Sequence, residues 1–127
     1  MSKATVHAKS SARKFGGKPE EYLVYHEWFD SSKSVIADNR HRALYHTAFC
    51  VGPGGLLEQV FGKTMTNSDG KEVSIRDIGE QHIREDFGGH IPTLQDFFSQ
   101  MTLAPWMSGI GRPPSAYQAQ PPVGVQD

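Results

Sequence analysis

Apolar side chains recur at helical spacing in several stretches of the chain. The first stretch predicts a helix over about 19–36, because Pro19 suits the first position of a helix and Glu20 and Glu21 suit its first turn. A second helix is predicted over 38–50, with Asp38 as its N-cap, and a short apolar helix over 56–61. The glycine- and proline-rich residues 52–55 must interrupt the helical pattern.

The middle of the chain changes to a strand-like period. Asp69-Gly70, between two short runs of β-forming residues, predicts a β-hairpin near 63–74. Ser74 and Asp77 have the spacing of a capping box that opens a helix over 75–87, and one more short amphipathic helix follows Pro92.

These elements predict a mainly α fold, a small helical domain of four to five helices with one β-hairpin and extended N- and C-terminal segments. Residues 1–18 are expected to form a basic N-terminal arm, 19–101 the helical core domain, and 102–127 a proline-rich tail.

Length and composition narrow the class of protein. A chain of 127 residues fits one domain, and it contains no apolar stretch long enough to span a membrane. The N-terminus lacks the apolar run of a signal peptide, so the cytoplasm is the expected location. The single Cys50 excludes a disulfide framework, and its apolar neighbours predict a buried, inert thiol.

Charge is unevenly distributed along the chain. Residues 1–18 carry five basic side chains and no acidic one, although the whole chain has a net charge of −1. Such a segment suits contact with nucleic acid phosphates or with an acidic patch of a neighbouring subunit, and a merely solvated terminus is the alternative. The tail holds two large apolar side chains, Trp106 and Met107, that are expected to anchor it to its own domain or to a partner. The candidate contact residues are Lys9, Arg13, Lys14, Lys18 and Trp106.

Six histidines are the main candidates for chemistry. His26, His41 and His82 each fall on the apolar face of a different predicted helix, and buried imidazoles need polar partners. One shared divalent ion, namely zinc, iron or manganese, would satisfy all three rings. The carboxylates that would complete such a site are Asp86, Asp30 and Glu58, the first two of which lie four residues after a histidine.

Hydrogen bonds to carbonyl groups or acids are the alternative for each of these rings. His46 lies well round the predicted helix from His41, so a surface or outer-shell position is expected for it. His7 and His90 fall in predicted loops and are expected to take no part.

Several strings together resemble a small family with a domain of unknown function, met in bacterial and tailed-phage genomes. They include 10–17, 26–30, 40–44, 66–70, 79–82 and 105–107, so that the likeness spans about 7–107. The resemblance implies a phage or prophage context. The chain departs from the family pattern at 52–55, which look like an insertion, and at Thr47, where relatives carry another histidine.

Two functions from different classes remain open at this stage. The first is a small metal-binding domain, with hydrolysis of a phosphate or nucleotide as its reaction. The second is a phage virion or assembly component whose termini contact neighbouring subunits in an oligomer.

Overall fold

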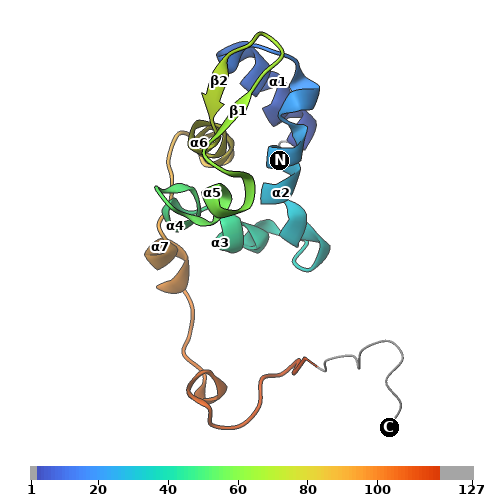
Figure 1. The fold of residues 1–127 in the computed structure, drawn as a ribbon. Coiled ribbons are helices and arrows are strands. Elements are labelled where there is room, and N and C mark those ends of the chain that lie inside the picture. Colours follow the sequence, from blue (N-terminus) through green and yellow to red (C-terminus); the bar gives the residue numbers. More distant parts are fainter. Residues whose placement is uncertain (1–2, 118–127) are drawn as a thin grey trace, which may run out of the picture.

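A computed structural model describes residues 3–117, which form a mainly helical body with one β-hairpin (Figure 1). The α-helices are α1 (Ala4–Phe15), α2 (Leu23–Phe29), α3 (Arg42–Tyr45), α4 (Ala48–Val51), α5 (Leu56–Phe61), α6 (Ile75–Asp86) and α7 (Leu94–Phe98). Short 3₁₀ turns are η1 (Pro19–Glu21), η2 (Ser31–Ser34), η3 (Asn39–His41) and η4 (Pro105–Ser108). The predicted mainly α class with one hairpin is confirmed.

The N-terminal segment differs from the expected extended arm. Ala4–Phe15 form helix α1, which packs against α2 and α6 and buries His7, Ala8 and Ser11. These residues recur at positions i, i+1 and i+4, so they form one stripe along the helix. This stripe is buried while the basic side chains of α1 are exposed, so the helix is part of the packed core.

The helix predicted over 19–36 is broken into η1, α2 and η2. Pro19 occupies the first position of η1, as expected. Serines then end the helical stretch, because their hydroxyl groups bond to backbone carbonyls: Ser31 donates to Trp28 O and Ser32 to His41 O.

The helix predicted over 38–50 is also broken, into η3, α3 and α4. Asp38 caps the first turn, as predicted, by accepting from the Arg40 N–H. His46 ends α3 with φ −89° and ψ 52°, and Thr47 is extended and caps α4 through its side chain. The chain direction therefore changes between His46 and Thr47.

The hairpin consists of β1 (Thr64–Thr66) and β2 (Glu72–Ser74), paired antiparallel with Met65 opposite Val73. Gly70 takes φ +81° in the turn, a conformation that glycine adopts without steric cost. Helix α6 follows directly, as predicted. The predicted capping box is wrong, because the Ser74 side chain makes no cap hydrogen bond.

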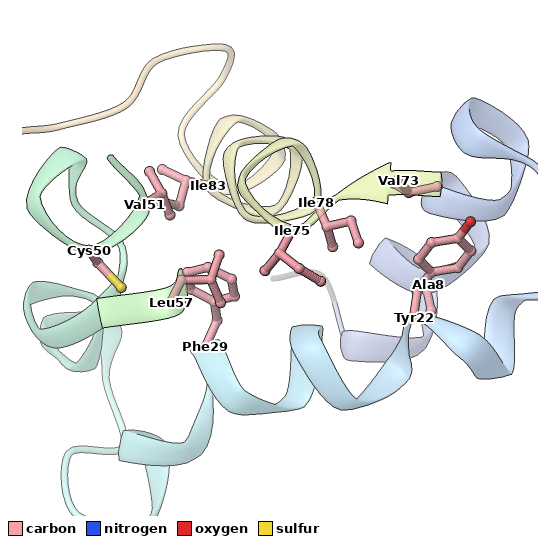
Figure 2. Packing of buried hydrophobic residues seen from close by; sticks show 10 residues of the cluster. All are labelled: Ala8, Tyr22, Phe29, Cys50, Val51, Leu57, Val73, Ile75, Ile78 and Ile83. Carbon is pink, nitrogen blue, oxygen red and sulfur yellow. The ribbon is translucent and has the colours of Figure 1, made fainter. Parts of the chain in front are cut away.

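Helix α6 is the central element of the body. Its apolar side chains Ile75, Ile78 and Ile83 are fully buried, and Figure 2 shows them among the buried residues of α2, α4 and α5. Close approach at Gly79 makes this packing possible: a Cβ there would collide with Leu57 and crowd Val51. His82 follows one turn later on the same face and stacks on Phe29 with ring centroids 4.6 Å apart, so the apolar packing of this face also positions the polar cluster.

Cys50 is buried in the apolar cluster, as expected, and burial raises the pKa of its thiol to about 11. No helix in residues 3–117 has the length and apolar character needed to cross a membrane.

Beyond α7 the chain runs away from the helical body (Figure 1). Turn η4 lies in this segment, and Leu103 and Ile110 on either side of it are 87% and 69% exposed. Positions 118–127 of the predicted tail lie outside the described residues.

Candidate metal centre

Two carboxylates and two imidazoles from three parts of the chain meet inside the body. Asp30 follows the last residue of α2, His46 follows the last residue of α3, and His82 and Asp86 lie one turn apart on α6. The two histidine side chains are 0% exposed, and those of Asp86 and Asp30 are 4% and 13% exposed. Groups that would normally be solvated are therefore gathered in the interior.

The four side chains each offer one atom to a common centre. His46 Nε2 lies 3.1 Å from His82 Nε2 and 3.1 Å from Asp86 Oδ2. His82 Nε2 lies 3.3 Å from Asp86 Oδ2, and Asp30 Oδ1 lies 3.6 Å from His46 Nε2 and 3.7 Å from His82 Nε2. All four atoms are mutually within 4.8 Å, close enough to hold one metal ion.

Positive groups face the outer side of both carboxylates. His7 Nε2 donates to Asp86 Oδ1 at 3.2 Å, and Arg42 Nη2 lies 3.8 Å from the same oxygen. Lys33 Nζ lies 3.6 Å from Asp30 Oδ2. The inner oxygens, Asp86 Oδ2 and Asp30 Oδ1, are thus left for the centre, with both carboxylates held in the charged form.

The protonation of these acids follows from the same contacts. Burial alone raises the pKa of Asp86, but hydrogen bonds from His46, His7 and His82 outweigh it and hold this pKa far below its ordinary value. Burial likewise opposes ionisation of Asp30, yet the neighbouring His82 and Lys33 keep its pKa lowered. Both groups are carboxylates at neutral pH, as metal ligands must be.

His7 is held between two acids. Its Nδ1 lies 2.7 Å from Glu85 Oε1 and its Nε2 lies 3.2 Å from Asp86 Oδ1. Since carboxylates only accept, both nitrogens of His7 donate and the ring is an imidazolium. Burial lowers the pKa of His7, but the hydrogen bonds to Asp86 and Glu85 outweigh it and leave the pKa raised.

His26 contacts the centre only through His82. His26 Nδ1 lies 2.9 Å from His82 Nδ1, and His26 Nε2 lies 2.7 Å from Ser11 Oγ. Nitrogens of His7, His26 and His82 form a second group close enough to hold an ion. However, both nitrogens of His7 are already engaged by acids, so this group lacks a free third ligand.

His41 lies at the edge of the centre. Its Nδ1 lies 2.8 Å from Asp38 O, and its buried Nε2 has no hydrogen-bond partner among the described residues. That Nε2 lies 3.5 Å from Asp30 Oδ1, but it belongs to neither group of mutually close ligand atoms.

The predicted ligand set is therefore brought together in part. His82, Asp86 and Asp30 meet as expected, His26 and His41 lie beside them, and Glu58 does not reach them. The Glu58 side chain instead accepts from the Gly54 N–H in the loop before α5.

Two expectations for histidines are corrected. His46, expected at the surface or in an outer shell, is fully buried and supplies a central nitrogen. The expectation assumed a continuous helix over 38–50, whereas the turn at 46–47 ends the helix and redirects the side chain. His7, expected in a loop, is buried on α1. The i, i+4 spacing of His7 and Ser11 beside Ala8 was the available sequence signal. His90 is exposed, as a bystander would be.

The candidate partner contacts lie on the surface. Lys9, Arg13, Lys14 and Lys18 are exposed on α1 and just after it, and Trp106 is 38% exposed in η4. Among residues 3–117, no hydrogen bond or ion pair joins any of these side chains to the histidine cluster.

Residues 2–107 match the model of a family described as a domain of unknown function, DUF6915. The match covers most of the chain, so the protein belongs to this family. No curated protein and no solved structure matches the sequence.

Burial of neutral His26 predicts acid sensitivity of the metal-free fold. Burial, and then the neighbouring His82, lower the pKa of His26 to about 3, whereas an unfolded histidine titrates near 6.5. Between these values only the unfolded chain binds this proton, so the free energy of unfolding falls as pH decreases, by at most about 1.4 kcal/mol per pH unit for this group. Urea unfolding in chelator at pH 7, 6 and 5 measures the slope. It should be shallower in His26→Gln and unchanged in a variant of exposed His90, and equal slopes in all three proteins contradict the prediction.

Proposed function

We propose that this member of the DUF6915 family binds one divalent transition-metal ion through His46, His82, Asp30 and Asp86. The observation that carries the proposal is the spacing of their four inner atoms: the separations that involve His46 or His82 are 3.1–3.7 Å, and all lie within 4.8 Å. A tetrahedral ion with bonds of about 2.0–2.2 Å requires ligand separations of roughly 3.3–3.6 Å. The side chains therefore fit such an ion with little movement.

Electrostatics also favours a cation at this position. The inner carboxylate oxygens are acceptors, and the two imidazole nitrogens facing them can at most share protons. Buried acceptors that face one another are unfavourable unless something positive lies between them. Two nitrogens and two oxygens suit zinc, iron(II) or manganese.

Metal content tests this proposal directly. Protein made without a histidine tag, loaded and desalted, is expected to retain about one ion per chain by elemental analysis. His46→Ala and Asp86→Asn should lose the ion, whereas His90→Ala, at an exposed position, should keep it. Ion at 1,000 times Kd should also stabilise the fold by about 4 kcal/mol. Absence of bound metal in the wild-type chain, or equal binding by all variants, contradicts the proposal.

We further propose hydrolysis of a phosphate ester or nucleotide as the reaction of this centre. A metal that takes a water as a fifth ligand lowers the pKa of that water toward neutrality. Arg42 and Lys33 place positive charge beside the two carboxylates. The buried Arg42 Nε has no hydrogen-bond partner among residues 3–117, and a phosphate oxygen is a suitable acceptor for a guanidinium.

Turnover by the metal-loaded protein tests this reaction. Release of phosphate from p-nitrophenyl phosphate and from nucleotides is expected with the wild-type chain and not with His46→Ala. Arg42→Met should lower kcat/KM at least tenfold, because the positive charge is lost, while retaining the metal. A loaded wild-type protein without turnover on any phosphate ester contradicts the reaction but leaves metal binding intact.

A role in assembly is the second candidate, and the exposed apolar residues of the tail favour it. Leu103, Trp106, Met107 and Ile110 are all at least 38% exposed and follow the point where the chain leaves the body. Apolar side chains gathered in an extended segment are typical of contacts with a neighbouring subunit, whether in a homo-oligomer or a virion.

Removal of the tail tests the assembly role. Deletion of 104–127 is expected to leave the helical content unchanged and to convert an oligomer to a monomer, as measured by light scattering. Trp106→Ser should weaken the same association, while Tyr117→Ser, in the same tail, serves as a control. A wild-type chain that is monomeric at all concentrations contradicts self-assembly through the tail.

A further inference from the structure

A continuous chain of hydrogen bonds leads from the surface to the candidate metal ligand His82. It begins at Glu85 on α6, passes through Gln81 and Ser11, and ends with His26 against His82. Apart from Glu85, whose side chain is 33% exposed, these residues are buried. None of the three intermediate residues belongs to the four-ligand centre.

The direction of each hydrogen bond is fixed from the Glu85 end. Gln81 Nε2 lies 3.0 Å from Glu85 Oε1 and 3.1 Å from the carbonyl oxygen of His7. Both of these oxygens only accept, so the amide nitrogen of Gln81 must face them. The amide oxygen of Gln81 is therefore the atom that lies 2.6 Å from Ser11 Oγ.

The direction of the next hydrogen bonds, from Ser11 to the metal ligand, is fixed in turn. Ser11 has one hydroxyl proton, and the Gln81 amide oxygen at 2.6 Å and the His7 carbonyl oxygen at 3.1 Å can only accept it. Ser11 Oγ must then accept from the Nε2–H of His26, which leaves His26 Nδ1 as an acceptor. The facing His82 Nδ1 must consequently carry a proton, and in a neutral ring His82 Nε2 is the free lone pair.

We propose that Ser11 and His26 are positioning residues that hold His82 in the tautomer whose Nε2 binds the metal. This inference rests on the metal centre proposed above. It assigns His26 to the support of a ligand rather than to the ligand set. Helix α1 then orients both ligands of α6, because His7 donates to Asp86 and Ser11 acts on His82 through His26.

Outer-shell partners of this kind change metal affinity by about 10–100-fold when they are removed. Ser11→Ala removes the acceptor of His26 and is expected to weaken zinc binding by that factor. His26→Leu should do the same. His26→Gln should bind almost as tightly as the wild-type chain, because its amide can accept from His82 and donate to Ser11. Ser34→Ala, at an exposed serine that bonds only to the backbone, is the matched control.

Two measurements test the inference. Long-range ¹H–¹⁵N spectra of the full, metal-free chain report which nitrogen of each ring is protonated. The expected result is a proton on His82 Nδ1 and on His26 Nε2. Competition with a chromophoric chelator then gives zinc affinity and stoichiometry, with circular dichroism confirming that each variant is folded. Should His26→Leu fail to fold, Ser11→Ala still provides the comparison.

The possible failures are distinguishable. A wild-type chain that binds no zinc overturns the metal centre itself. One zinc per chain with unchanged affinity in Ser11→Ala and His26→Leu overturns only the positioning role. An unprotonated His82 Nδ1 in the metal-free wild-type chain also overturns it. Two zinc ions per chain, falling to one in His26→Gln, would make His26 a ligand and overturn the assignment as well.

Discussion

The burial of two carboxylates, Asp30 and Asp86, is the constraint on which the rest of the structure depends. An isolated buried carboxylate is strongly unfavourable, so each needs positive or donating partners. His7, Arg42 and Lys33 meet their outer oxygens, and His46 and His82 meet the inner ones. The burial of His7, His46 and His82 can be understood as the response to this one requirement.

The short, broken helices around the centre serve the same requirement. A continuous helix repeats side-chain directions at fixed intervals, so His46 and Val51, five residues apart, could not both point toward α6. The change of direction at 46–47 allows both, and the end of α2 at Asp30 brings a carboxylate to the same point. Helix α6, by contrast, is unbroken, and its i, i+4 spacing alone presents His82 and Asp86 together.

Helix α1 supplies no ligand to the metal centre, yet the arrangement of the ligands depends on it. Its buried stripe supplies a cation to one ligand and a link in the hydrogen-bond chain to another. Because these contacts are shielded from water, their directions are well defined. The tail differs from α1, because it leaves the body and exposes its apolar residues. This exposure is the reason for proposing a partner there.

The sequence by itself determined the helical class, the hairpin at Asp69-Gly70, the cap at Asp38 and the pairing of His82 with Asp86. All of these depend on neighbours within a few residues, where backbone geometry sets side-chain direction. It also placed Asp30 among the candidate ligands. Only the tertiary structure decided that His46 enters the centre, that His7 is buried and that Glu58 stays at a loop. Those outcomes depend on where helices break and on which elements pack together, and these are set by contacts between residues far apart in the chain.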